Sequence, residues 1–324
     1  GGTVDKLESI PGFKTAIPRE EFFRIVNENG LALIGQSGNM VPADKKLYAL
    51  RDVTATVNSI PLIASSIMSK KIAAGSDRIL LDVKTGSGAF MKTLEDSIAL
   101  AKEMVSIGEH VGRRTVALIT DMDRPLGCAI GNALEVREAC ETLRGNGPED
   151  LTEVCVELAA NMLWLAEKGE LAQCRDLAKQ QIENGRAFAK LKEMVQAQGG
   201  DVRMLEDPAQ FTQPKVCYEV PAPRDGFLYT MNTELCGIAS VELGAGRERK
   251  EDPIDFSAGI VLRKKIGDFV QKGQILASFY SSEEKKCLIA EQTFLQALCI
   301  QDKMPKPVPL IHARVSANGV ETSE

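Results

Sequence analysis

The stretch YALRDVTATVNSIPLIASSIMSKK (residues 48–71) sets charged and polar side chains among apolar ones in two helical patterns. Residues 43–57 predict one helix. Ser59 can cap a second helix, and Pro61 is tolerated in its first turn. The stretch therefore predicts two consecutive helices whose polar residues need an explanation beyond core packing.

The second of these helices carries a mixed face. Four of its residues follow the spacing i, i+3, i+4 and i+7 and so lie on one side: Ile63, Ser66, Ile67 and Lys70. Such a face suits a flat heterocycle, with isoleucines on the ring, a serine that donates and accepts hydrogen bonds, and a lysine that only donates them. Arg51, on the preceding helix, adds a planar fork of donors.

Ordinary packing explains the same pattern. Lys70 can extend its aliphatic stem along apolar surface, Ser66 can be a small packing residue, and Arg51 can pair with a nearby carboxylate. The pattern by itself does not choose between a ligand site and a packed surface.

The sequence around this stretch alternates between strands and helices. Buried strands are predicted at 31–35, 77–83 and 114–120, and helices at 19–29, 97–112, 150–169 and, as a pair, 172–200. Strands separated by helices indicate an α/β fold with a mostly parallel sheet. Beyond about residue 214, turn residues and alternating runs are typical of a separate β-rich domain, and the polar tail 313–324 is expected to fray.

Composition argues against several classes of function. The 324 residues carry a net charge of −6 and are 44% hydrophobic, which is enough for a large core and two domains. There is no basic patch of the kind that nucleic-acid binders carry, and no apolar run of membrane-spanning length. The eight cysteines form no C-x-x-C pair, and with two histidines a zinc site is not expected. Reduced thiols in a cytoplasm are the simplest interpretation.

Long strings of the sequence resemble the signature of thymidine and pyrimidine-nucleoside phosphorylases. Besides residues 48–71, these strings are GGTVDKLESIPGF (1–13), LLDVKTGSGAFM (80–91), RPLGCAIGNALEVREA (124–139) and ETLRGNGPEDLTE (141–153). The resemblance runs from the first residue to at least residue 280.

The resemblance implies a central, mostly parallel mixed sheet flanked by helices, part of a small all-α domain, and a C-terminal β-rich domain similar to a barrel-sandwich. The implied domains are an α/β part at 1–40 and 75–214, helices of the small domain at 41–74, and a C-terminal α+β domain at 215–324. KTGSGAF (84–90) would be a tight turn that brings Phe90 to the pocket, and His110 and His312 would be structural or surface residues.

The implied activity is reversible phosphorolysis, in which a pyrimidine nucleoside and phosphate give the free base and a pentose 1-phosphate in nucleoside salvage. Arg51, Ser66 and Lys70 would bind the pyrimidine edge. Cleavage of the glycosidic bond leaves negative charge on the departing base, and fixed donors at that edge stabilise it. Four residues would pack on or near the base, with core packing as the open alternative: Tyr48, Ile63, Ile67 and Phe90.

Phosphate and potassium are the implied co-substrate and cofactor. In the family, phosphate binds a glycine-rich segment upstream of the GGT motif. This segment is expected to be missing here, so that Thr3, a hydroxyl after two glycines, is the one ligand carried over. K⁺ would bind the backbone carbonyls of Leu126 and Ala129 and the carboxylate of Glu138, although Glu138 also fits a solvated helix residue. The implied partner is a second copy, as a homodimer formed through the helical domain if its upstream helices are present.

Other interpretations stay open. A broad enzyme would accept uridine, thymidine and deoxyuridine, whereas a thymidine-specific phosphorylase would be narrower. A related phosphoribosyltransferase has no C-terminal β-rich domain. GIVLRKKIGDFVQKGQIL (259–276) is similar to part of a biotin- or lipoyl-carrier domain, but Lys264 and Lys265 lack the flanking methionines of a modified lysine. A chain without its phosphate-binding segment could also be a base-binding remnant that does not catalyse.

Overall fold

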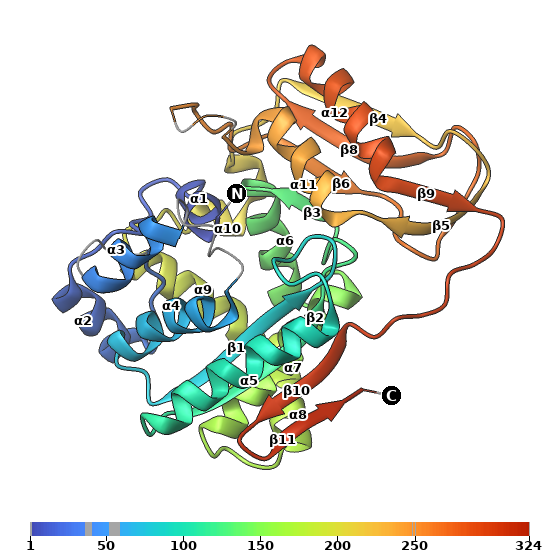
Figure 1. Cartoon of the computed structure of the whole chain (residues 1–324). Helices are drawn as coiled ribbons and strands as arrows, with labels where there is room; N and C mark the ends of the chain where they lie inside the picture. The colour runs from blue at the N-terminus through green and yellow to red at the C-terminus, as the bar shows by residue number, and fades with distance from the viewer. Residues whose placement is uncertain (1, 36–40, 52–58, 248, 250, 324) are drawn as a thin grey trace. The chain divides into compact units, whose positions relative to one another are not determined.

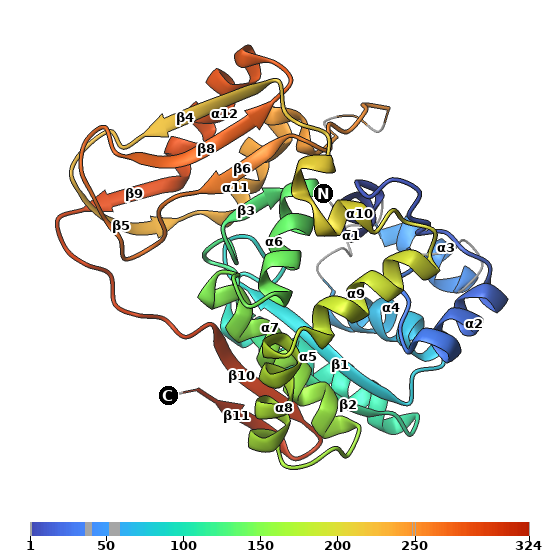
Figure 2. The same cartoon turned by 180° about the vertical axis from the view of Figure 1, so that it is seen from behind.

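The computed structural model describes residues 2–35, 41–51, 59–247, 249 and 251–323, with the backbone alone for residues 45 and 48–51. The chain divides into two compact units. The first unit comprises Gly1–Gly35, Asp123–Leu151 and Gln181–Val308, and the second comprises Gln36–Met122, Thr152–Gln180 and Pro309–Glu324. Figures 1 and 2 show the chain from opposite sides.

The second unit is built on a four-stranded sheet in the order β1–β2–β10–β11. Its strands are β1 (Arg78–Thr85), β2 (Arg114–Asp121), β10 (Ile311–Ser316) and β11 (Gly319–Thr322). β1 and β2 pair in parallel across a helical crossover, whereas β10 pairs antiparallel with β2 and β11. The predicted mixed sheet is confirmed, with one parallel ladder among the three described.

Helices cover both faces of this sheet. The helices of this unit are α3 (Pro42–Arg51), α4 (Ile60–Ala73), α5 (Leu94–His110), and the greater parts of α7 (Glu149–Leu165) and α8 (Leu171–Glu183). α5 lies against one face and α7 and α8 against the other (Figures 1 and 2). Cation–π contacts join α7 to the sheet: the Trp164 ring centroid lies 5.2 Å from the guanidinium of Arg114 on β2 and 4.6 Å from that of Arg314 on β10.

The prediction of a frayed tail is wrong, and so is the assignment of the last strands to the C-terminal domain. β10 pairs with β2, and its residues Ala313 and Val315 are each 1% exposed. Because side chains alternate along a strand, a run with an apolar residue at every second position can cover a core and still look polar on average. The residues from 309 onward therefore complete the sheet of the second unit.

The strand predicted at 31–35 is absent from the structure. The N–H of Leu33 donates to Oε1 of Gln198 at 2.8 Å, and Nε2 of Gln198 donates to the carbonyls of Leu33 and Lys14, both at 2.8 Å. Gln198 is 2% exposed. The buried amide supplies the hydrogen bonds that a neighbouring strand would have supplied, so an apolar extended run needs no ladder here.

The first unit contains a helical part and a β-rich part. The helical part consists of α1 (Thr3–Glu8), α2 (Arg19–Asn29), α6 (Ala133–Leu143), α9 (Arg186–Ala197), α10 (Arg203–Glu206) and η1 (Pro208–Gln210). Helix α2 ends at Gly30 as predicted, because glycine adopts the left-handed conformation there, with φ of 84°.

The β-rich part confirms the predicted change after residue 214. Its sheets have the orders β3–β6–β8–β4 and β7–β5–β9. The elements are β3 (Ala129–Gly131), β4 (Val216–Pro221), β5 (Gly226–Met231), α11 (Thr233–Ser240), η2 (Val241–Ala245), β6 (Gly259–Leu262), β7 (Phe269–Val270), β8 (Ile275–Ser281), α12 (Glu284–Ala297) and β9 (Leu298–Gln301). Strand β3 comes from the glycine-bearing segment before α6.

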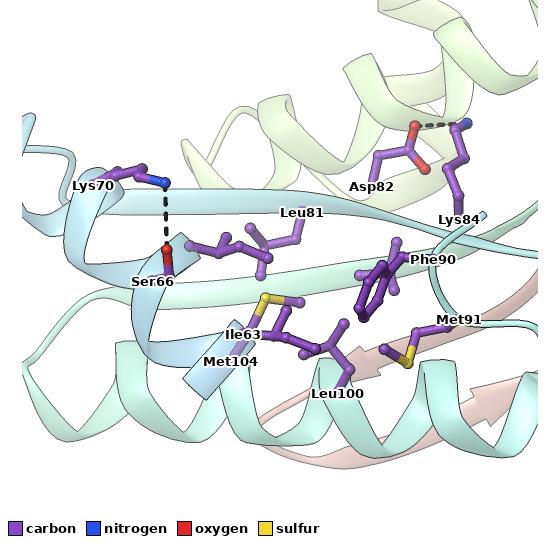
Figure 3. A pocket seen from close by; sticks show the side chains of 12 residues that line it. Ile63, Ser66, Lys70, Leu81, Asp82, Lys84, Phe90, Met91, Leu100 and Met104 are labelled. Carbon is purple, nitrogen blue, oxygen red and sulfur yellow. Dashed lines mark hydrogen bonds and ion pairs between the residues drawn. The ribbon is translucent and has the colours of Figure 1, made fainter. Parts of the chain in front are cut away.

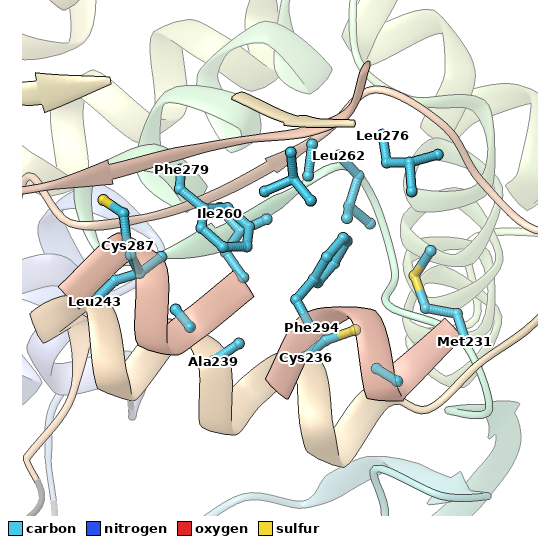
Figure 4. Close-up of a cluster of buried hydrophobic side chains, with 14 of the residues drawn as sticks. Met231, Cys236, Ala239, Leu243, Ile260, Leu262, Leu276, Phe279, Cys287 and Phe294 are labelled. Carbon is cyan, nitrogen blue, oxygen red and sulfur yellow. The ribbon is translucent and has the colours of Figure 1, made fainter. Parts of the chain in front are cut away.

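The core of this part lies between its strands and two helices. Figure 4 shows α11 and α12 side by side beneath β6 and β8, with apolar side chains filling the space. Phe279 and Phe294, both fully buried, meet edge to face with ring centroids 5.4 Å apart. The α/β class with a C-terminal β-rich domain is thus confirmed. Within the described residues, no helix has the length and apolar character needed to cross a membrane.

Candidate active site

Helix α4 begins where the sequence predicts. Ser59, at the cap position, is extended with φ of −71° and ψ of 108°, and Pro61 lies in the first turn. The Ser59 hydroxyl makes no capping hydrogen bond, so the helix starts by backbone geometry and by the fixed φ of the proline. Ala64 and Met68, both 0% exposed, anchor the helix in the core of the second unit.

The mixed face of α4 lines a cavity of about 400 Å³ in the second unit. Helix α4 contributes all four residues of the predicted face: Ile63, Ser66, Ile67 and Lys70. Strand β1, the loop after it and helix α5 contribute the rest: Leu81, Asp82, Val83, Lys84, Phe90, Met91, Leu100 and Met104. Figure 3 shows Ile63, Leu100 and Met104 gathered between α4 and α5, with Ser66 and Lys70 at one end. The cavity is therefore an apolar space with a polar end.

Ser66 and Lys70 form this polar end together. Nζ of Lys70 donates to Oγ of Ser66 at 3.4 Å, as the dashed line in Figure 3 marks. Ser66 is 6% exposed, and the Lys70 side chain is 32% exposed. A buried hydroxyl beside a partly exposed ammonium can offer two donors to the edge of a planar ligand.

Asp44 is a neighbour of Lys70 that the sequence analysis missed. Its Oδ2 atom lies 3.4 Å from Nζ of Lys70, is buried, and accepts no hydrogen bond from the described residues. The Asp44 side chain is only 10% exposed. A single aspartate near the start of a helix gave no signal, because the contact joins two helices that only the tertiary structure brings together.

The loop after β1 is the tight turn predicted for KTGSGAF. Gly86 has φ of 120°, the N–H of Ala89 donates to the Gly86 carbonyl at 3.0 Å, and Met91 bridges back to Thr85. Phe90 follows this turn, lines the cavity and is 55% exposed. An exposed phenylalanine at the rim of a cavity is available to a ligand in a way that a core phenylalanine is not.

Asp82 and Lys84 also border the cavity, but their side chains pair with each other. Nζ of Lys84 lies 2.8 Å from Oδ2 of Asp82, and Oγ1 of Thr120 donates to Oδ1 of Asp82 at 2.5 Å. Alternation along β1 places both on the face opposite to Leu81, as Figure 3 shows. We therefore assign them to the structure of the sheet and not to the polar end.

The structure does not place the remaining predicted site residues in this cavity. The side chains of Tyr48 and Arg51 lie outside the described residues; Arg51 is the last residue of α3. Thr3 is the first residue of α1 in the first unit and is exposed. His312 pairs with Asp121 at 3.5 Å within the sheet, and His110 hydrogen-bonds the Ser106 carbonyl at 2.7 Å, as expected of structural residues.

The predicted potassium ligands lie in the first unit, around the segment 126–129. Oε1 of Glu138 accepts hydrogen bonds from the N–H groups of Cys128, at 2.8 Å, and Ala129, at 3.0 Å. Burial raises the pKa of Glu138 above its usual value, while these hydrogen bonds and the Lys265 ammonium oppose that shift. Glu138 is therefore a bonded, partly buried carboxylate and not a solvated helix residue.

Comparison with known proteins shows which family the chain belongs to. The family described as "Glycosyl transferase family, a/b domain" matches residues 1–188, and "Pyrimidine nucleoside phosphorylase C-terminal domain" matches residues 227–301. The pyrimidine-nucleoside phosphorylase of Geobacillus stearothermophilus is 56% identical over 286 residues, which is 88% of this chain and 66% of the relative. That of Staphylococcus haemolyticus is 57% identical over 285 residues, again 88% and 66%.

A third relative aligns further along the chain. The pyrimidine-nucleoside phosphorylase of Bacillus subtilis is 51% identical over 318 residues, which is 98% of this chain and 73% of the relative. The chain thus spans about two thirds of the length of the first two relatives and somewhat more of the third. With both of its parts matched in order, the chain belongs to the pyrimidine-nucleoside phosphorylase family.

Proposed function

We propose that this chain is a pentosyltransferase that catalyses the reversible phosphorolysis of pyrimidine nucleosides. Uridine, thymidine and deoxyuridine would give the free base and ribose or deoxyribose 1-phosphate, as a step of nucleoside salvage. The observation that carries the proposal is the polar end of the α4 cavity, where Ser66 and Lys70 meet at the edge of an apolar space.

The chemistry needs donors at this end. In phosphorolysis the bond between C1′ of the sugar and N1 of the base breaks, and its electron pair remains on the base while a phosphate oxygen bonds to C1′. The negative charge spreads over the base carbonyl oxygens. Lys70 and Ser66, with Arg51 as the third proposed donor, would stabilise that charge as it develops, and Ile63, Ile67, Phe90 and Tyr48 would hold the ring.

Phosphate and potassium complete the proposal. Thr3 would donate to phosphate. The carbonyls of Leu126 and Ala129 and the carboxylate of Glu138 would hold K⁺, whose bound charge would fix this segment. The donor set fits such an ion. The N–H of Leu262 donates to the Cys128 carbonyl, so the N–H and the carbonyl of the next residue, Ala129, both point away from β6. The Ala129 carbonyl therefore lies on the side of β3 where the Ala129 N–H donates to Glu138.

Two narrower outcomes compete with the broad proposal: a thymidine-specific phosphorylase and a chain that binds the base without catalysis. The test is release of free base from uridine, thymidine and deoxyuridine at several phosphate concentrations. Turnover of all three that saturates with phosphate supports the broad enzyme, and turnover of thymidine alone supports the narrow one. Base binding by calorimetry without turnover would refute catalysis by this chain.

Replacing Asp44 by asparagine is expected to lower kcat about tenfold or more, because Lys70 loses the carboxylate that holds its ammonium, and misplacement of about 1 Å can reduce a rate about 100-fold. The KM for phosphate should stay unchanged. Kinetics of Asp44→Asn, with Asp44→Glu as the conservative rescue, test this. Asp77→Asn, at a side chain that is 75% exposed, is the matched control. An Asp44→Asn enzyme with normal kcat would remove Asp44 from the site.

A further inference from the structure

The segment 126–129 in the first unit is held by hydrogen bonds along its length. The N–H of Gly127 donates to Oδ2 of Asp150 at 3.3 Å, and the next two N–H groups donate to Glu138. Gly127 has φ of 72°, and a Cβ built on it would lie 2.3 Å from Oε2 of Glu138. The backbone therefore wraps closely around two carboxylates, and only glycine fits at its centre.

Lys265 adds a positive charge to this cluster. Its Nζ atom donates to the Gly127 carbonyl at 2.5 Å and forms an ion pair with Asp150. The side chains of Lys265 and Asp150 are 26% and 18% exposed. Partial burial strengthens this pair relative to a surface pair, because water screens it less.

The backbone around Lys265 fixes where its side chain starts. Lys265 lies in a turn between β6 and β7. The N–H of Lys265 donates to Oδ2 of Asp268 at 2.8 Å, and the N–H of Asp268 donates to the Lys265 carbonyl at 3.0 Å. A modified lysine of a carrier domain would stand exposed at such a turn. Lys265 instead points its ammonium at the segment 126–129.

The cluster formed by Glu138, Asp150 and Lys265 carries a net negative charge. Glu138 and Asp150 bring two negative charges and Lys265 brings one positive charge, which leaves one negative charge. Among the residues that the structure describes, Glu135 and Arg263 are further ionic groups that face the cluster. Glu135 forms an ion pair with Lys6 at 2.5 Å. Arg263 is exposed, and its Nε donates to Oγ of Ser278. Neither changes the sum strongly, since one is neutralised and the other is screened by solvent.

We propose that Lys265 determines the ion preference of the proposed cation site, because by neutralising Asp150 it leaves a net charge that one monovalent cation balances. This inference rests on the cation site of the proposed function. Without Lys265 the cluster of Glu138 and Asp150 would carry two negative charges, and sites rich in carboxylate charge favour divalent ions such as Ca²⁺. Lys265 is thus a specificity residue that the C-terminal domain contributes to the segment 126–129.

The test uses the full chain without substrate and three variants: Lys265→Met, Lys265→Arg, and Lys264→Met as the matched control. Lys264 is the adjacent residue, and its replacement changes the net charge equally. The unfolding midpoint is measured in KCl, in choline chloride of equal concentration, and after addition of CaCl₂. In the wild type, Lys265→Arg and Lys264→Met, K⁺ should raise the midpoint by about 2–4 °C over choline. In Lys265→Met the K⁺ effect should disappear and Ca²⁺ should give a rise of similar size.

The comparison of the two methionine variants decides the inference. If Lys265→Met and Lys264→Met respond alike to K⁺ and Ca²⁺, Lys265 has no role in ion preference, even if Lys265→Met is less stable in every salt. A wild-type chain without a K⁺-specific rise would argue against the proposed cation site itself. In that case a Ca²⁺ response confined to Lys265→Met would still support the charge argument.

Discussion

Replacing Lys70 by methionine is expected to lower kcat for pyrimidine-nucleoside phosphorolysis about 10²–10³-fold, the usual effect of removing one fixed donor from a developing negative charge. Methionine keeps most of the aliphatic stem against the cavity and removes the ammonium that meets Ser66 at 3.4 Å. The loss should be larger in kcat than in KM, because the charge on the base exists fully only after the glycosidic bond has begun to break. Steady-state kinetics with uridine and phosphate measure both.

Lys71 offers a matched control for Lys70. It is the next residue on α4, it is exposed, and it does not line the cavity. Lys71→Met makes the same chemical change and should leave kcat within about twofold, since exposed charges interact weakly through water. Equal losses in both variants would mean that the net charge of α4 matters and that the polar end of the cavity does not.

Replacing Val315 by aspartate is expected to lower the free energy of unfolding by about 4 kcal/mol or more, because it puts an unpaired charge in a packed core. Val315 is 1% exposed and lies opposite Ala117 of β2, which is fully buried. It belongs to the same apolar cluster as Leu100 and Met104, which line the cavity. Denaturant unfolding should therefore show a lower midpoint, and base binding should weaken together with it.

Val308 provides the same substitution at an exposed position. Val308 is 47% exposed, and its backbone carbonyl accepts a hydrogen bond from Arg124. Val308→Asp should change stability by less than about 0.5 kcal/mol. If Val315→Asp were as mild as Val308→Asp, β10 would contribute little to the core, and the expectation of a frayed tail would be correct after all.

Local patterns predicted the elements that carry the site. The spacing of Ile63, Ser66, Ile67 and Lys70 placed them on one face of α4, because a helix repeats every 3.6 residues whatever surrounds it. Strands β1 and β2 and the turn at Gly86 were equally visible. β2 is buried almost throughout, β1 alternates between buried and more exposed residues, and the turn needs a glycine at a positive φ, so each leaves a mark within a few residues.

Contacts between distant segments were not visible in the same way. Gln198 meets Leu33, Asp44 meets Lys70, and Lys265 meets Gly127, across separations that range from 26 to 165 residues. Each of these side chains also suits a solvated surface, so its residue type alone predicts nothing about its partner.

The sequence by itself determined the family, the order of most helices and strands, and the face of α4 that meets the cavity. These follow from short-range periodicity and from long strings that resemble one family. Only the tertiary structure decided that 311–316 is a core strand, that a glutamine replaces a strand at 31–35, and that Asp44 and Lys265 stand beside the proposed ligands. The physical reason is that burial and ion pairing depend on which distant segments meet, and packing the whole chain into its cores settles that.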